Sequence, residues 1–384
     1  MMLDPGVVQL NAGTLSPTPA PVFDAAVRLR RLQAESPTEF LARKTPLLIR
    51  RSRAALAAFL RADPADLLLI PNVTFSLNVV SSSVPLRPGD EILTSDHEYG
   101  AMVSCWKRRA KKAGARLRRV RLPYDSEDAG AVVDAFRRAI GPRTRVLFFS
   151  HVTSTTGLVL PAAALCAMAR RRGVITVVDG AHAAGMVPLD LGRIGADFYG
   201  ANAHKWLMAP AGCGFLHVRR ERKALLRSII TSWGWGYPAR RRERDSGGGG
   251  SCWQRDFEFH GVTDRTPQMV LPELLAFRRR LGGERAIARR VRALSDHARA
   301  RLSRLGLPPA TPRNPALRGA MTAFEIPARL SRILRDRLWR RHRIEVPVTS
   351  AAGRHFLRVS TAWFNTPAEI DRLAKALGPA LRRV

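Results

Sequence analysis

The sequence of 384 residues has only four cysteines, scattered at positions 105, 166, 213 and 252. No CxxC pair or Cys/His metal spacing connects them, so we expect reduced structural thiols and no metal site. No apolar run approaches the roughly 20 residues that a membrane-spanning helix needs. The start, MMLDPGVVQL, lacks the basic residues and long apolar core of a signal peptide. These absences predict a cytoplasmic globular protein that does not contact a membrane.

Acidic residues are also few, with 31 Asp and Glu against 64 Lys and Arg, and the formal net charge is +33. A surface this basic attracts phosphate backbones, so a nucleic-acid-binding protein is one alternative. The basic residues are nearly all arginines spread along the chain, and the denser segments 108–121 and 335–343 carry no recognition motif or aromatic platform. We interpret them as solvated helix faces and loop edges, and do not expect nucleic acid to be the physiological partner.

Short β-rich segments alternate with helical ones over the first two thirds of the chain. The expected strands are 66–70, 91–95, 116–122, 145–152, 173–179, 196–201 and 213–218, and the expected helices are 76–83, 101–113, 129–140 and 162–172. Several strands are continuous apolar runs, as in a parallel sheet buried on both faces. The alternation predicts a wound α/β domain, whose ligand binds at the carboxyl ends of the strands.

The sequence changes character after residue 265. Arg/Leu/Ala-rich helices over 272–305 precede a short α+β tail that contains HFLRVSTAWFNT. The chain is long enough for two domains. We expect an N-terminal segment over 1–20, a large α/β domain over 21–265 and a smaller α+β domain over 266–384.

An aspartate and a lysine in neighbouring segments indicate a cofactor. Asp179 closes the apolar run VITVVD, His182 follows three residues later, and Lys205 lies in FYGANAHKWL. Pyridoxal phosphate (PLP) needs a lysine amine for its Schiff base and a carboxylate that keeps its pyridine nitrogen protonated. A strand-ending aspartate is often only a cap residue, and most lysines are solvated. The combination, rather than either residue alone, predicts a PLP site.

Six ordered motifs resemble class V PLP-dependent aminotransferases, and in particular the isopenicillin N epimerase-like group. They are NVTFSLN (72–78), RPGDEILTSDHEYGA (87–101), SHVTSTTGLVLP (150–161), VVDGAHAAG (177–185), NAHKWL (202–207) and LRVSTAWFNT (357–366). The resemblance covers nearly the whole chain. It implies fold type I of the PLP-dependent transferases, an amino-acid-like substrate, and a homodimer with its active sites near the subunit interface.

The resemblance also implies which residues hold the cofactor phosphate. Val73 and Thr74 begin a helix after a strand, where free N–H groups and the helix dipole favour an anion. Thr74 also suits a plain N-cap. Asn202 and His204 resemble further phosphate contacts. Relatives commonly carry a Gly-Thr-x-Asp motif whose threonine reaches the neighbouring subunit's phosphate, but segment 261–264 reads Gly-Val-Thr-Asp, with Val262 at the place of that threonine. Two alternatives are then open for the phosphate contact, the backbone N–H groups of this segment or Thr263.

The cofactor ring has its own implied partners. Either His97 or Tyr99 stacks on the ring, and the family pattern favours His97. Asp179 pairs with the pyridine nitrogen, because a charge-assisted hydrogen bond strengthens the ring as an electron acceptor. His182 lies beside the ring hydroxyl. Ser154 stands where many relatives carry asparagine.

The implied chemistry centres on Lys205, which forms the Schiff base and then moves protons at the substrate α-carbon. Arg358, in the LRVS segment, grips the substrate α-carboxylate, for which a bidentate guanidinium is suited. Epimerisation, elimination and transamination all use such a lysine, so the motifs do not choose between them. We expect an isopenicillin N epimerase-like enzyme that acts at the α-carbon of an amino acid.

A lyase is the alternative within the same fold. Cysteine desulfurases of this class need a reactive cysteine in a loop of the small domain, and this sequence has no cysteine after Cys252. We therefore do not expect persulfide formation. A C–S lyase that acts on a sulfoxide or selenocysteine substrate needs no such thiol and remains open.

Overall fold

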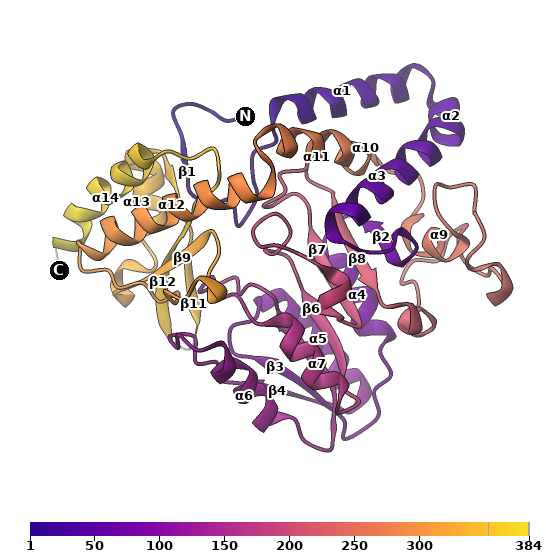
Figure 1. The fold of residues 1–384 in the computed structure, drawn as a ribbon, viewed down its shortest axis with the longest axis horizontal. Helices are drawn as coiled ribbons and strands as arrows, with labels where there is room; N and C mark the ends of the chain where they lie inside the picture. The colour runs from indigo at the N-terminus through magenta and orange to yellow at the C-terminus, as the bar shows by residue number, and fades with distance from the viewer. Residues whose placement is uncertain (352, 383–384) are drawn as a thin grey trace.

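The computed structural model describes residues 1–351 and 353–382 (Figure 1). Its centre is a seven-stranded sheet in the order β2-β8-β7-β6-β5-β3-β4. Strand β8 runs in the direction opposite to the other strands of this sheet. The mostly parallel α/β sheet confirms the predicted fold class, and each predicted strand is present within two residues of its expected bounds. The strands are β2 (Leu67–Ile70), β3 (Glu91–Ser95), β4 (Arg116–Val120), β5 (Thr144–Ser150), β6 (Ile175–Asp179), β7 (Phe198–Asn202) and β8 (Gly214–Val218).

Helices cover both faces of this sheet. The four predicted connecting helices are α4 (Val73–Ser83), α5 (Gly100–Ala113), α6 (Ala129–Ala139) and α7 (Ala162–Arg170). Alternate side chains of one strand enter different apolar clusters, with Leu67 and Leu69 in one and Leu68 and Ile70 in the other. Both faces of the sheet are therefore buried at its inner strands, which explains why several of its strands contain continuous apolar runs, whereas the edge strand β4 reads RLRRV.

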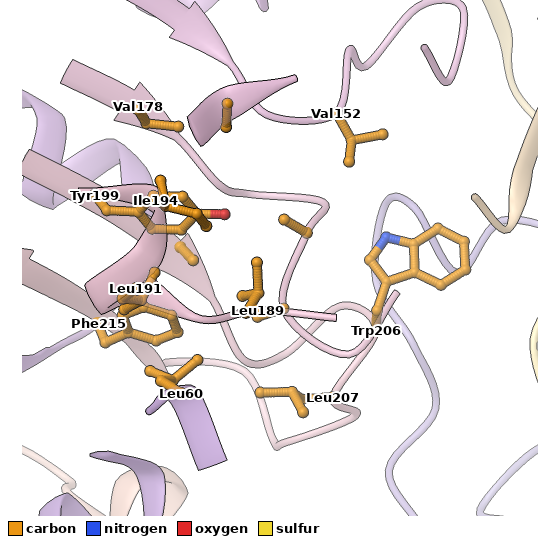
Figure 2. Close-up of a cluster of buried hydrophobic side chains, with 14 of the residues drawn as sticks. Leu60, Val152, Val178, Leu189, Leu191, Ile194, Tyr199, Trp206, Leu207 and Phe215 are labelled. Carbon is orange, nitrogen blue, oxygen red and sulfur yellow. The ribbon is translucent and has the colours of Figure 1, made fainter. Parts of the chain in front are cut away.

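Further helices pack around the sheet, and only the last of them lies in a segment that was predicted to be helical. They are α1 (Ala20–Glu35), α2 (Pro37–Glu39), α3 (Thr45–Leu60), α8 (Leu191–Ile194), α9 (Cys252–Glu258), α10 (Thr266–Met269) and α11 (Leu271–Arg280). Figure 2 shows one cluster that they help to bury, in which Leu60 of α3 and Leu191 of α8 lie near Phe215 of β8. In the described part of the chain, no helix combines the length and apolarity needed to cross a membrane.

A smaller layer lies toward the C-terminus (Figure 1). Its antiparallel sheet has the order β11-β12-β9. The elements are α12 (Gly283–Ser303), β9 (Met321–Ile326), α13 (Leu334–His342), β11 (Val348–Ala351), β12 (Arg354–Ser360) and α14 (Pro367–Arg382). Both α10 and α11 contact α3, whereas α12 contacts α14 and β9. We therefore propose that the small domain begins at α12, somewhat after the expected residue 266.

The first residues of the chain belong to this smaller layer. Strand β1 (Val8–Gln9) pairs in parallel with β10 (Ile344–Glu345). Val8 and Leu10 are buried in the same apolar cluster as residues of α12 and α14. The N-terminal segment thus contributes to the core of a domain that is otherwise built from the C-terminal third.

Candidate active site

Several of the predicted site residues lie at the ends of strands or just after them, at one edge of the large sheet. Asp179 ends β6, and its register partner Ser150 ends the neighbouring β5. Asn202 ends β7, next to β6, and Ser95 ends β3, next to β5. Since these strands are parallel, their carboxyl ends meet at the same edge, where wound α/β folds bind ligands.

Lys205 follows β7 and lies against His182. Its Nζ is 3.4 Å from His182 Nε2, and Trp206 Nε1 donates to His182 Nδ1 at 3.4 Å. Burial lowers the pKa of Lys205 to about 8; Asp179 opposes this shift and Arg358 adds to it. Burial also holds the pKa of His182 well below its usual value. The lysine is therefore easily deprotonated, which is the state in which an amine acts as a nucleophile or a base.

Asp179 is a buried carboxylate with spare acceptor capacity. Its Oδ1 accepts a hydrogen bond from the Ala181 N–H at 2.9 Å. Burial raises its pKa, while the bond from Ala181 and the charge of Lys205 oppose that rise. Within the described residues no side chain forms a salt bridge with Asp179. A buried carboxylate of this kind is stabilised by an incoming cationic N–H group.

Arg358, on β12, is a buried cation held by uncharged oxygens. Its Nη1 donates to the Ser154 carbonyl at 2.5 Å and the Ser154 hydroxyl at 3.2 Å, and its Nη2 donates to Asn11 Oδ1 at 3.3 Å. Its Nε is buried without a partner. Burial lowers the pKa of the guanidinium to about 10. Its positive charge has no carboxylate partner within residues 1–351 and 353–382, so the group is suited to bind a carboxylate ligand.

The start of α4 differs in one detail from expectation. The Val73 N–H donates to Asn202 Oδ1 at 2.9 Å, and Asn72 caps the helix by accepting from the Phe75 N–H at 2.9 Å. Val73 and Asn202 thus bond to each other and tie α4 to β7. Thr74 is exposed at this helix N-terminus, and it is the residue of the motif best placed to meet an anion.

The two candidates for stacking have very different surroundings. The His97 side chain has 0% exposure, its Nδ1 is 2.8 Å from Asp96 Oδ1, and its ring centroid is 4.7 Å from that of Tyr124. Tyr99, which precedes α5, is 51% exposed. Protein atoms therefore already cover the His97 ring, whereas the Tyr99 ring is available to a ligand.

The remaining predicted residues complete the description. His204 is partly buried, with a buried and unpartnered Nδ1, and burial lowers its pKa to about 4. Thr263 and Val262 are exposed in the loop after α9, and Thr263 borders a cavity of about 420 Å³ together with Arg265 and Trp233. None of the described residues forms a His/Cys/Asp/Glu cluster suited to a metal. The four cysteines are free thiols.

The side chains present fit PLP. One sheet edge and the adjoining β12 bring together four groups. They are a lysine that is easily deprotonated, a buried carboxylate with spare acceptor capacity, a helix N-terminus and a buried arginine with uncharged partners. These match an aldehyde, a pyridinium nitrogen, a phosphate and a substrate carboxylate respectively. The chemistry of the donor set therefore supports the cofactor that the motifs imply.

Glu98 is a site residue that the sequence analysis missed, although it lies in the DHEYG motif. It is buried, and its two carboxyl oxygens accept from the Ser95 and Ser150 hydroxyls, each at 2.5 Å. Burial raises its pKa to about 7; the two serine bonds oppose the rise and the charge of Asp179 adds to it. The sequence feature that could have revealed Glu98 is a carboxylate between two aromatic residues at the end of a predicted strand.

We expect Glu98→Gln to change how stability depends on pH. The folded-state pKa of about 7 lies above the ordinary value of 4.5, so between these pH values the folded protein holds a proton that the unfolded chain has lost. As pH rises from 4.5 to 7, the free energy of unfolding of the wild type should therefore fall by up to about 3 kcal/mol relative to that of the variant. Urea unfolding of both proteins at pH values of about 5 and 8, at one PLP concentration, measures this. Parallel pH profiles would refute it.

Gly180 is required by the packing beneath Asp179. A Cβ at this position would lie 2.2 Å from Tyr199 Cε1. The Tyr199 ring is fully buried, as Figure 2 shows, and its hydroxyl is 2.8 Å from His151 Nδ1. We expect Gly180→Ala to destabilise the fold by about 1–3 kcal/mol through overpacking. Thermal unfolding tests this, with Gly141→Ala as the control, because a Cβ there meets nothing within 4 Å. Equal stability of the two variants would contradict the account.

Comparison with known proteins identifies the family of the chain. The family model for class-V aminotransferases matches residues 7–373. Isopenicillin N epimerase of Amycolatopsis lactamdurans is 46% identical, over 98% of this chain and 95% of the relative. The enzyme of the same name from Streptomyces clavuligerus is 44% identical, over 98% and 96%. Hercynylcysteine sulfoxide lyase of Schizosaccharomyces pombe is 23% identical over 98% and 95%.

Solved structures share the fold. The cystine C–S lyase C-DES, in complex with cysteine persulfide, superposes with a TM-score of 0.85 at 24% identity, over 97% of each chain. The cysteine desulfurase CsdA of Escherichia coli gives a TM-score of 0.83 at 22% identity, over 100% of this chain and 96% of the other. The match to the family model and the two full-length relatives lead to one conclusion: the chain belongs to the class-V aminotransferase family of PLP-dependent enzymes.

Proposed function

We propose that the enzyme inverts the configuration at the α-carbon of isopenicillin N or a closely related amino acid. The observation that carries this proposal is the identity of 46% and 44%, over nearly the whole length, to two isopenicillin N epimerases. The site supports it, because a lysine whose pKa is about 8 lies in the same site as a carboxylate-binding arginine. When bound, PLP withdraws electrons from the α-carbon and makes its proton acidic.

Each side chain has a defined task in this proposal. Lys205 binds the cofactor covalently and afterwards removes or returns the α-proton, for which its lowered pKa suits it. Asp179 holds a proton on the cofactor nitrogen, and His182 keeps the amine oriented through the 3.4 Å contact. Arg358 fixes the substrate carboxylate, with Ser154 supporting the guanidinium. Thr74 holds the phosphate, and Val73, Asn202 and His204 shape that end of the site.

For the stacking contact we propose Tyr99 rather than His97. The His97 ring is enclosed, whereas half of the Tyr99 side chain is exposed. We expect Tyr99→Ala to weaken PLP binding about tenfold, because it removes an aromatic contact. Fluorescence titration of the apoenzyme with PLP measures this effect. Tyr99→Phe is the matched control and should bind PLP as the wild type does; a larger loss in His97→Ala than in Tyr99→Ala would reverse the assignment.

The reaction is tested by incubating the holoenzyme with isopenicillin N in deuterium oxide. We expect a mixture of the two epimers, with deuterium at the inverted carbon, because proton removal and return exchange that hydrogen with solvent. Chiral chromatography and mass spectrometry of the product measure both. Unchanged configuration together with a wild-type PLP absorbance band would reject the epimerase proposal and leave the family assignment intact.

A C–S lyase is the second candidate, and the likeness to hercynylcysteine sulfoxide lyase favours it. The same lysine would remove the α-proton, and a sulfur leaving group would depart from the β-carbon. Release of pyruvate and a sulfur product from cysteine-derived substrates, without epimer formation from isopenicillin N, would select this candidate. The absence of cysteine after Cys252 argues against a persulfide intermediate on the protein.

We also propose that the enzyme is a cytoplasmic homodimer, as the family resemblance implies. Two exposed tryptophans near the Thr263 loop support a surface that a second subunit covers. Trp233 is 78% exposed and lines the same cavity as Thr263, and Trp235 is 68% exposed. Analytical ultracentrifugation tests the dimer. In a dimer, Thr263→Ala should weaken PLP binding if Thr263 replaces the missing threonine contact, whereas Val262→Ala should not.

A further inference from the structure

The side chain of Asn11 has one fixed orientation beside Arg358. Its Nδ2 donates to Glu345 Oε1 at 2.9 Å, so its carbonyl oxygen must point the other way. That Oδ1 accepts from Arg358 Nη2 at 3.3 Å and from the Thr14 hydroxyl at 2.8 Å. Asn11 is only 3% exposed, and both ends of its amide have partners. A buried amide satisfied in this way is held rigidly.

The backbone around Asn11 is also anchored. The Leu10 N–H donates to the Glu345 carbonyl at 3.0 Å, and the Leu10 carbonyl accepts from the Ser360 N–H at 2.9 Å. A Cβ at Gly13 would lie 3.0 Å from Arg358 Nη2, so this glycine allows the chain to pass close to the guanidinium. Residues 10–16 therefore form one wall beside Arg358.

The same wall reaches the lysine end of the site. The Ser16 N–H donates to the carbonyl of His204, the residue before Lys205, at 3.3 Å. The segment 10–16 thus connects the loop of the covalent lysine to the strand that carries Arg358. A group bound between these two side chains would be enclosed by this segment.

We propose that Asn11 and Glu345 are positioning residues that hold Arg358 in the orientation that binds the substrate α-carboxylate. The inference rests on the proposed function in one respect, which is that the substrate carries a carboxylate. Asn11 occupies one N–H of the guanidinium with an uncharged oxygen, so the positive charge stays available. Glu345 supplies the negative acceptor that fixes the amide. Its charge is paired with Arg335 at 3.2 Å and does not contact Arg358.

Introducing a charge at position 11 tests whether Asn11 positions Arg358. Asn11→Asp would place a carboxylate on Arg358, where it competes with the substrate. We expect its KM for isopenicillin N to rise about 30- to 100-fold, and that of Asn11→Ala about tenfold, with kcat within about threefold of wild type. A purely structural role would instead lower the amount of folded enzyme and leave KM unchanged. Arg340→Ala, an exposed change on α13, is the control.

A pair of Glu345 variants provides an independent comparison. Glu345→Leu removes the acceptor for Asn11 Nδ2 and should raise KM about tenfold, whereas Glu345→Gln keeps an acceptor oxygen and should recover most of that loss. Equal KM values for the Leu and Gln variants would overturn the role of Glu345. If the Asn11 variants do not fold, this pair of variants still tests whether Glu345 positions Arg358 through Asn11.

Crystal structures of the wild-type, Asn11→Ala and Glu345→Leu holoenzymes give a readout that needs no substrate. We expect the Arg358 guanidinium to turn away from its wild-type position in both variants. An unmoved guanidinium would refute the proposal even if KM changed. If the wild type fails to epimerise isopenicillin N, the proposed function fails, and these structures still decide whether Asn11 and Glu345 position Arg358.

Discussion

Lys205→Ala should lower kcat by at least about 10³-fold, because it removes both the covalent link to the cofactor and the group that moves the α-proton. The structure places this amine 3.4 Å from His182 Nε2, in surroundings that lower its pKa to about 8. Few other lysines exist to replace it, since the chain has seven and Lys205 is the one beside Asp179 and Arg358.

The measurement combines kinetics with chemical trapping. Borohydride reduction of the wild-type holoenzyme, followed by peptide mass spectrometry, should find PLP attached to Lys205, and the variant should bind PLP without attachment. Lys44→Ala is the matched control, because the Lys44 side chain is 43% exposed and lies 3.9 Å from Glu39 in a surface pair. If PLP were trapped on another lysine of the wild type, the assignment of Lys205 as the lysine that binds the cofactor would be wrong.

Asp179→Asn should lower kcat about 100-fold, which is the second-largest effect we expect. A neutral amide cannot hold a proton on the cofactor nitrogen, so a charge-assisted hydrogen bond worth about 3 kcal/mol is lost in the transition state. The carbonyl oxygen of the new amide would still accept from the Ala181 N–H, which limits structural damage. The Lys205 pKa should fall further, because the carboxylate that opposes its depression is gone.

This prediction has two readouts, the value of kcat and the pH dependence with which the free Lys205 amine of the apoenzyme reacts with an amine-modifying reagent. The midpoint of that pH dependence should move to lower pH in Asp179→Asn, because the charge of Asp179 no longer opposes the lowering of the Lys205 pKa. Asp197→Asn is the control for burying an amide in place of a carboxylate. Asp197 accepts from the Thr176 N–H at 2.8 Å and directly precedes β7, so its replacement should affect stability without moving that midpoint. A kcat within about threefold of wild type in Asp179→Asn would contradict the role.

Most of the large sheet could be predicted from the sequence, because a strand buried on both faces contains a continuous apolar run. Segment 145–152 contains such a run at 146–149 and forms β5. The same logic could not find β1 and β10, since each has two residues and no period. It also could not reveal that β8 is reversed, because direction depends on the connection and not on composition. Helix α11 is rich in leucine and arginine like α12, which follows it, so its contacts with α3 and not its composition place it with the large sheet.

The site residues show the same difference between features that the sequence predicts and features that depend on tertiary packing. Lys205, Asp179 and Arg358 were predicted because their chemistry needs specific residue types near specific motifs. Side-chain contacts that depend on packing were not, such as the bond between Val73 and Asn202 that uses an N–H expected for phosphate. Enclosure of His97 by Tyr124 is likewise a tertiary effect, since the partners are far apart in sequence.

The pairing of β1 with β10 joins two segments that leave the ribosome far apart in time. Val8 emerges well before its partner Ile344. Strand β1 therefore stays unpaired until β10 has been translated, and contacts this distant in sequence slow folding. Asn11 reaches Glu345 and Arg358 only at that late step. The contact between Asn11 and Arg358 therefore forms only after β12 has been translated, well after the segment that carries Lys205.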